Sequence, residues 1–239
     1  FDLEDKACFQ LVGWNPEADE IIGGYRFTRW SMASFHENGQ PYVNTEHLFD
    51  FSQKFIDEYF PYCIEMARAF VQPKYQSAQS GRKALFALDN LWDGIGGLVA
   101  SDPTVKYLSG KVTIYSSSPE LSRKAMIYYL DMCCGDREGL ITSKNPELWT
   151  PEQGEFFKDM FVGEDYKENY LILNNFVKSF GDTIPPLIHS YIGLSSTMKT
   201  FGTTFDPDFG DCYDTAMIIT IDDIYQEKKE RYIESYHKN

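Results

Sequence analysis

Strands and helices alternate along residues 62–134, and this order constrains the fold more than any other feature of the chain. Residues 62–71 and 107–115 have the composition of strands, while 82–100 and 120–134 have the periodicity of helices. Alternation of this kind predicts a sheet with helices packed on its faces. We therefore expect an α/β fold with a central mixed β-sheet flanked by helices. The helices are too few for a TIM barrel, in which every strand is followed by one.

The other segments are predicted from the same patterns and from turn residues. We expect strands at 7–14, 20–30 and 214–221, a short extended piece at 40–44, helices at 52–59, 169–180, 185–194 and 224–236, and a loop at 203–211. Residues 135–163 are rich in charge and turn residues and predict an insertion or lid. With no repeat and no low-complexity linker, residues 1–239 are expected to form a single domain that carries this insertion.

Charge and cysteine content exclude several classes of function. The net charge is −14, which opposes binding to nucleic acid and leaves at most a peripheral contact with anionic membranes. Five cysteines occur without a CxxC pair, so neither a disulfide framework nor a zinc site is expected. Such cysteine usage favours a reducing cytoplasm. No apolar run approaches the roughly 20 residues that a membrane span needs.

A strand, a polar loop and a helix follow one another between Glu65 and Ala84. The loop contains Ser80 and Gly81, and the first turn of the helix carries Arg82 and Lys83. A helix N-terminus offers free N–H groups and partial positive charge, which suit a phosphate. Two cations there oppose the helix dipole, so an anionic ligand that offsets them is one interpretation. An ordinary loop with solvated basic residues is the other.

Glu65 and Arg68 interrupt the apolar strand at 62–71. Residues three apart lie on opposite faces of a regular strand, but a β-bulge could bring both side chains to one cleft. A charged pair inside an apolar strand is costly unless it is paired or hydrogen-bonded. A structural ion pair and a functional site are therefore both open.

Several segments in shared order resemble the GNAT acyltransferase superfamily. They resemble most closely the N-acyl amino acid synthases and ornithine–acyl carrier protein acyltransferases, which often carry the label "hemolysin" and are related to acyl-homoserine-lactone synthases. The matching segments are Ile21–Phe27, Glu65–Tyr75, Leu91–Ile95, Pro185–Leu194 and Asp206–Phe209. The loop Gln79–Ala84 departs from the Q/R-x-x-G-x-G/A pattern that holds coenzyme A in this superfamily, which favours acyl carrier protein as the donor.

The resemblance implies a GNAT-like fold and an N-acyltransferase that needs no permanently bound cofactor. A fatty or 3-hydroxy-fatty acyl group would move from acyl carrier protein, or from acyl-CoA, to the α-amine of a glycine- or ornithine-like amino acid. The product would be an N-acyl amino acid of lipid metabolism. An acetyl-CoA-dependent N-acetyltransferase acting on a small amine, and a non-catalytic module that binds lipid or carrier protein, remain the alternatives.

The resemblance also implies roles for individual residues. Glu65 and Arg68 would be catalytic, Glu65 as the base that accepts a proton from the acceptor ammonium, because only the neutral amine attacks a thioester. Tyr128 would protonate the leaving thiolate, although packing against the sheet explains it equally well. The remaining roles are acceptor binding by Arg26, Arg68 and Tyr191, and phosphopantetheine binding by Ser80, Gly81, Arg82, Lys83 and Ser118. From its position alone, Ser118 is most simply the N-cap of the helix at 120–134.

Neither a metal site nor a covalent acyl-enzyme is expected. Asp206, Asp208, Asp211 and Asp214 form an acidic cluster that lacks the terminal Glu of a calcium loop, so capping and turn roles are expected for them. The adjacent Cys133 and Cys134 fall at a predicted helix C-terminus, where the helix dipole disfavours a thiolate. Direct attack of the amine on the thioester is therefore expected.

Overall fold

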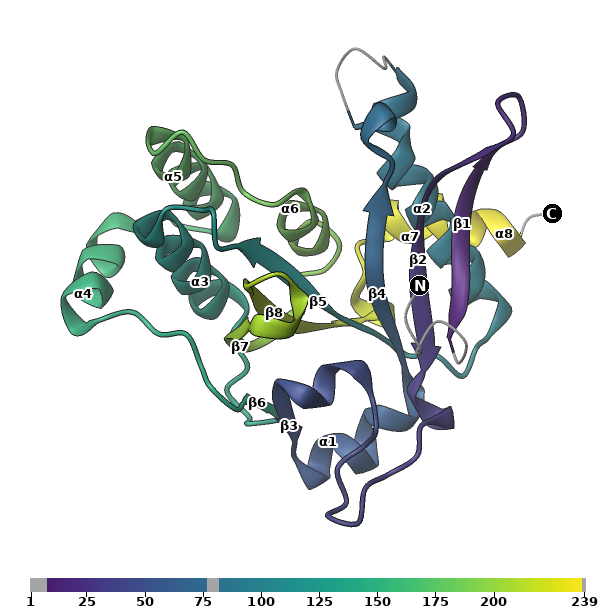
Figure 1. The fold of residues 1–239 in the computed structure, drawn as a ribbon, viewed down its shortest axis with the longest axis horizontal. Helices are drawn as coiled ribbons and strands as arrows, with labels where there is room; N and C mark the ends of the chain where they lie inside the picture. Colours follow the sequence, from purple (N-terminus) through teal and green to yellow (C-terminus); the bar gives the residue numbers. More distant parts are fainter. Residues whose placement is uncertain (1–7, 77–81, 238–239) are drawn as a thin grey trace. The chain divides into compact units, whose positions relative to one another are not determined.

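The computed structural model describes residues 8–76 and 82–237. Within these ranges, the side chains of 82–90, 235 and 237 are not described. The contacts between residues divide the chain into two compact units. The first unit consists of the described parts of 1–32, 60–110 and 220–239, and the second consists of 33–59 and 111–219. Six strands form one sheet in the order β1-β2-β4-β5-β8-β7, and β3 and β6 form a second, two-stranded sheet (Figure 1). The expected mixed α/β architecture is confirmed.

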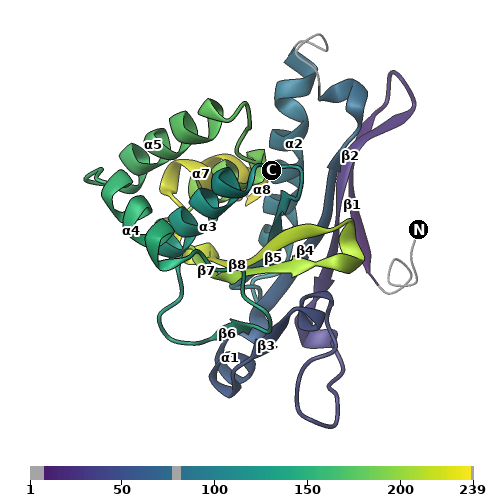
Figure 2. The same ribbon diagram turned by 60° about the vertical axis from the view of Figure 1, so that its left-hand side comes forward.

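The first unit is built on an antiparallel meander. Strand β1 pairs with β2, and β2 with β4, while β4 pairs in parallel with the start of β5. Its elements are β1 (Phe9–Asn15), β2 (Glu20–Arg29), η2 (Trp30–Met32), η4 (Phe60–Tyr62), β4 (Cys63–Val71), η5 (Pro73–Tyr75), α2 (Arg82–Ser101), the start of β5 (Tyr107–Tyr115), η8 (Ile221–Asp223), α7 (Gln226–Tyr232) and α8 (Glu234–His237). Helix α2 packs on β1 and β2 and also touches α7 (Figure 2).

Helix α2 and helix α7 approach closely at Gly96. A Cβ atom at this position would lie 1.7 Å from the backbone oxygen of Tyr232. At the next residue, Gly97, an added Cβ would meet only the ring of Tyr236, a side chain that is 48% exposed. A backbone atom cannot rotate away as an exposed ring can, so only Gly96 is required by the packing.

We expect Gly96→Ala to destabilise the protein by about 1–3 kcal/mol, the usual cost of overpacking. Gly97→Ala in the same helix is the matched control, and we expect it to be neutral or slightly stabilising because alanine favours helix. Thermal or urea unfolding of the two variants measures the difference. Equal stability of both variants would show that α7 is not seated against Gly96.

The second unit contains the remaining elements. They are η3 (Asn44–His47), β3 (Phe49–Phe51), α1 (Gln53–Glu58), the end of β5, α3 (Glu120–Cys134), β6 (Ile141–Ser143), α4 (Pro151–Met160), α5 (Tyr166–Ser179), α6 (Pro186–Ile192), β7 (Lys199–Asp206), η7 (Pro207–Phe209) and β8 (Cys212–Thr220). Helices α4 and α5 both pack against α3 (Figures 1 and 2). Side-chain N-caps are present on α1, α4 and α5. The side chain of Ser52 accepts a hydrogen bond from Phe55 N, that of Thr150 from Gln153 N, and that of Asp165 from Lys167 N and Glu168 N.

Three local expectations are wrong. Residues 199–206 form strand β7 where a loop was expected from 203. The expected extended piece at 40–44 makes only an isolated bridge between Phe35 and Pro41. Ser118 does not cap α3, since the N-cap is Pro119 and no side chain bonds the helix N-terminus. The proline already fixes an extended backbone there, so a serine cap is not needed to start the helix.

Candidate active site

Arg26 and Glu65 lie on the same face of the β2–β4 pair. In the register, Arg26 is opposite Ala67, and Thr28 is opposite Glu65. Directly opposite residues share a face, as do alternate residues of one strand, so the side chains of Arg26 and Glu65 point to the same side of the sheet. The two are diagonal neighbours, a separation that long side chains can span.

This face is the one turned away from helix α2. Leu11 of β1 is opposite Tyr25 in the register and contacts α2 at Gly94, so α2 covers the Tyr25 face. Arg26 and Glu65 are nevertheless only 3% exposed each. Burying charged groups is costly unless they are paired or hydrogen-bonded, so two opposite charges buried on one face mark this place as a candidate site.

Trp30 holds the carboxylate of Glu65. Its indole Nε1–H donates to Glu65 Oε2 over 3.0 Å, and the ring is fully buried. The indole is stacked on Phe60, with ring centroids 5.0 Å apart and planes 16° from parallel. The residue was not predicted from the sequence, where the one available signal was a tryptophan at the end of an apolar strand.

Cys63 precedes Glu65 by two residues and lies on the same face of β4. Burial raises the pKa of this thiol well above its usual range, and the nearby charge of Glu65 raises it further. The thiol therefore keeps its proton, and Cys63 is a structural neighbour of the carboxylate rather than a nucleophile.

Strand β4 carries a β-bulge at Arg68. Gly24 pairs with Phe70 and Arg26 with Ala67, so two residues of β4, beginning with Arg68, lie opposite Tyr25 alone. Arg68 has φ = 52°, a left-handed conformation that is unfavourable outside glycine. The bulge, which the sequence left as one possibility, is present, and Arg68 is exposed at this point. Strained backbone of this kind is concentrated at functional sites.

The ladder between β4 and β5 is short. Its pairs run from Cys63–Tyr107 to Met66–Gly110, while β4 continues to Val71. The ladder therefore ends one residue after Glu65, which pairs with Ser109. Glu65 thus lies next to the point where the two parallel strands stop bonding each other.

Tyr128, Tyr191 and Ser118 lie in the second unit. Tyr128 packs among Trp149, Phe157 and Phe161, with ring centroids 4.8–5.8 Å apart. Tyr191 is buried on α6, and Ser118 is partly buried, with its backbone oxygen accepting from Arg123 Nη1. The contacts of Tyr128 are those of a packed aromatic side chain, and its role as an acid remains a prediction.

Most of the predicted donor loop lies outside the residues that the structure describes. Ser80 and Gly81 are outside the described residues, and Arg82 and Lys83 open helix α2 as expected, although their side chains are not described. The placement of the two cations in the first turn of a 20-residue helix is thus confirmed, while their contact with a phosphate remains a prediction.

Comparison with known proteins identifies the family. A family model described as an acetyltransferase (GNAT) domain matches residues 1–84. The glycine N(alpha)-acyltransferase of Phocaeicola vulgatus is 43% identical over 239 residues, which are 100% of this chain and 73% of that protein. The chain belongs to the GNAT acyltransferase family. A glycine N(alpha)-acyltransferase of Bacteroides thetaiotaomicron is also 43% identical, over 99% of this chain and 70% of that protein.

The GNAT family assignment confirms the resemblance seen in the sequence, and the chain is an acyltransferase. An aminoglycoside 6'-N-acetyltransferase complexed with coenzyme A aligns with 90% of this GNAT chain and 73% of its own, at 12% identity and a TM-score of 0.35. A likeness of this extent adds nothing to the family assignment.

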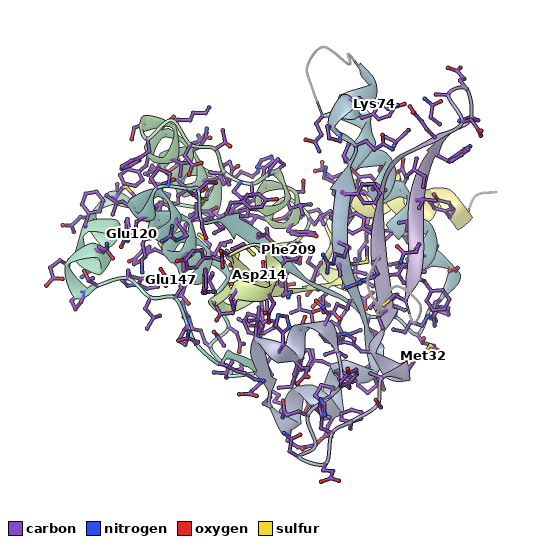
Figure 3. The ribbon with its side chains drawn as sticks, viewed as in Figure 1. Met32, Lys74, Glu120, Glu147, Phe209 and Asp214 are labelled. Carbon is purple, nitrogen blue, oxygen red and sulfur yellow. The ribbon has the colours of Figure 1, made fainter. Side chains whose placement is uncertain are left out.

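The acidic cluster in the second unit of this GNAT protein was expected to have only capping and turn roles, but its carboxylates also contact cationic side chains. Asp206 accepts from Asp208 N, as expected, but its carboxylate also lies 3.2 Å from His47 Nε2 and 3.7 Å from Lys111 Nζ. Asp214 lies on β8 (Figure 3). Its Oδ2 is 3.2 Å from Nζ of the same lysine. Among the described residues, no group of three or more His, Cys, Asp and Glu side chains is placed to hold a metal ion.

The adjacent thiols of Cys133 and Cys134 are unsuited to covalent catalysis. Burial raises the pKa of Cys134 to about 12, and burial also raises the pKa of Cys133. Tyr129 of α3 donates a hydrogen bond from its hydroxyl to Tyr166 O of α5 over 2.9 Å, and burial raises the pKa of this hydroxyl as well.

Within the described part of the chain, no helix is long and apolar enough to cross a membrane.

Proposed function

We propose that this acyltransferase moves an acyl group from a thioester to the α-amine of glycine, giving an N-acylglycine. The observation that carries the acceptor is the 43% identity, over the whole chain, to two glycine N(alpha)-acyltransferases. Support from the site comes from a buried carboxylate and a buried guanidinium on one face of β2 and β4. These are the two groups that a zwitterionic amino acid needs, one for its ammonium and one for its carboxylate.

The reaction is a direct acyl transfer. Glu65 accepts a proton from the glycine ammonium, directly or through water, and the neutral amine attacks the thioester carbonyl carbon. The tetrahedral intermediate collapses with breakage of the C–S bond. The thiolate leaves and takes up the second proton of the nitrogen, so that the products are the amide, the free thiol and one proton released to water. Backbone N–H groups at the end of β4 are our candidates for holding the oxyanion.

Arg26 is our first candidate for the acceptor carboxylate, and Arg68 is the second. Arg26 shares its face and its burial with Glu65, whereas Arg68 lies in the exposed bulge. Tyr191 as an acceptor contact, Tyr128 as the acid for the thiolate, and Ser80, Gly81 and Ser118 as donor contacts stay predictions. So does the organisation of residues 1–239 as a single GNAT-like domain with an insertion at about 135–163, which contains β6 and α4.

The donor proposed here is a long-chain acyl group on acyl carrier protein, with acyl-CoA as the alternative. The sequence of the donor loop supports this preference, and so do the many aromatic residues, 16% of the chain, which suit an acyl channel. We place the reaction in the cytoplasm, which five free cysteines support.

One incubation tests the function. Purified protein is mixed with hexadecanoyl-acyl carrier protein, hexadecanoyl-CoA or acetyl-CoA and with glycine, ornithine, lysine or serine, and products are detected by mass. Hexadecanoylglycine from the carrier-protein donor is expected to dominate. Acetylated products alone would identify a short-chain N-acetyltransferase, and no product with any donor would favour a non-catalytic binding module.

Charge reversal of Arg82 and Lys83 to Glu should raise the KM for acyl carrier protein steeply at low salt. The two cations open α2, where the anionic donor is proposed to bind, and attraction between surface charges is screened by salt. Lys167→Glu with Lys178→Glu on α5 makes the same change in net charge at two exposed lysines and should leave this KM unchanged. Wild-type donor affinity at low salt in the first double variant would remove Arg82 and Lys83 from the donor site.

A further inference from the structure

Trp30 is placed so that its indole N–H, the one hydrogen-bonding group of its side chain, donates to Glu65. The residue follows β2 in the short helix η2, and η2 packs against both β4 and η4. Phe60 of η4 stacks on the indole, which fixes the plane of the ring. The 3.0 Å bond from Nε1 to Glu65 Oε2 therefore comes from a ring that is fully buried and held on its face.

An indole N–H can donate but cannot accept, so this bond has one direction. Donation to a carboxylate stabilises the ionised form over the protonated form, and a hydrogen bond to a charged group is about twice as strong as a neutral one. The bond also sets the rotamer of Glu65, because one of its two oxygens must remain opposite the indole. Both effects bear on a group that has to take up a proton at a defined place.

We propose that Trp30 is a positioning residue for the base of the acyl transfer: its indole N–H holds one oxygen of the Glu65 carboxylate and so aims the carboxylate at the acceptor amine. The inference rests on the proposed function, in which Glu65 accepts the proton of glycine. It adds a residue that the family match does not assign. Phenylalanine at position 30 could fill most of the same space, so packing alone would not require the N–H.

Several described residues lie beside Glu65 besides Trp30, and Thr28 of β2 is directly opposite it. Arg26 comes from β2 on the same face, Cys63 comes from β4, and Ser109 of β5 is its partner in the parallel ladder. Burial raises the pKa of the Cys63 thiol, which therefore stays neutral. These neighbours are unchanged when Trp30 alone is altered, so a change in proton uptake can be attributed to the lost N–H.

The test is the pH dependence of kcat/KM for glycine with hexadecanoyl-acyl carrier protein, in wild type, Trp30→Phe and Trp92→Phe. Trp92 is a second buried tryptophan, on α2, and serves as the matched control. We expect Trp30→Phe to move the acid limb of the profile upward by about one pH unit, with about a tenfold loss of rate on that limb. The KM for the acyl donor should stay at the wild-type value, and Trp92→Phe should leave the profile in place.

A double-mutant cycle separates positioning from general damage. Glu65→Gln removes the ionisable group, so adding Trp30→Phe to Glu65→Gln should cost little further rate if the two residues act as a unit. An equal loss in both backgrounds, or a loss in Trp30→Phe with the acid limb unmoved, overturns the positioning role. If phenylalanine prevents folding, β-(3-benzothienyl)alanine at position 30 keeps the bicyclic shape without the N–H, and the same shift is expected.

Failure of this inference and failure of the proposed function give different results. An inactive Glu65→Gln beside a Trp30→Phe enzyme with the wild-type profile leaves the base in place and overturns only the role of Trp30. A fully active Glu65→Gln removes the base itself and overturns both.

Discussion

Glu65→Gln is expected to lower kcat by about 10²–10⁴-fold, the usual contribution of a positioned general base. Glutamine keeps the shape of the side chain, and its amide oxygen can still accept from Trp30 Nε1. It cannot take up the proton of the glycine ammonium. Turnover is followed as thiol release and as N-acylglycine by mass, and folding is followed by thermal unfolding. The KM for the acyl donor should change little, because the carboxylate acts on the acceptor.

Asp102→Asn is the matched control for Glu65→Gln. Asp102 is a buried carboxylate in the same unit, and it forms an ion pair with Arg29 and accepts from Thr104. The hydrogen bond from Thr104, and then the charge of Arg29, hold the pKa of Asp102 below its usual range. Its replacement should lower stability and leave kcat near the wild-type value. A Glu65→Gln protein that unfolds would instead favour a structural ion pair at Glu65.

The elements with strong local signals were predicted closely. Strand β5 and helix α3 begin and end where their periodicity and the proline before α3 placed them. In both segments the apolar residues that the pattern selects are buried, for example Leu108, Ile114, Met126 and Leu130. Local propensity and tertiary burial agree there, and a single sequence then suffices.

Strand β7 was missed because its local signals point elsewhere. Its end approaches Asp206-Pro207, and its threonines and glycine have the composition of a turn. Those threonines are buried by partners distant in the chain: Thr203 bonds Thr215 across the β7–β8 pair, and Thr204 Oγ1 donates to Asn145 O. Pairing with β8 thus overrides a weak local preference.

The candidate site shows the same contrast between features that local sequence signals predict and features that depend on the fold. Glu65 and Arg68 could be chosen from the sequence, since charges inside an apolar strand call for an explanation. Which arginine shares the face of Glu65 depends on the bulge at Arg68 and on the β2–β4 register, and neither can be counted along one strand. Trp30 is 35 residues from Glu65, and only the fold brings its N–H to the carboxylate.

Arg26→Lys is expected to lower kcat/KM for glycine by about 10²-fold while changing the rate with glycinamide little. Arginine can bind a carboxylate through two parallel N–H groups, and each hydrogen bond to a charged group contributes about 1.5–3 kcal/mol. Lysine keeps the charge but not the planar fork, so it should not replace arginine. The net charge of −14 repels free carboxylates in general, which makes a specific cation necessary for the acceptor.

The measurement is the ratio of kcat/KM for glycine to that for glycinamide, compared between wild type and variant so that the intrinsic reactivities of the two amines cancel. Arg29→Lys at the end of the same strand is the control, because Arg29 pairs with Asp102 and should leave the ratio unchanged. A collapse of the ratio in Arg68→Lys, with Arg26→Lys unaffected, would move the carboxylate to the arginine in the bulge. Equal rates with glycine and glycinamide in the wild type would contradict a carboxylate clamp altogether, since a buried guanidinium facing the acceptor must distinguish a charged group from a neutral amide.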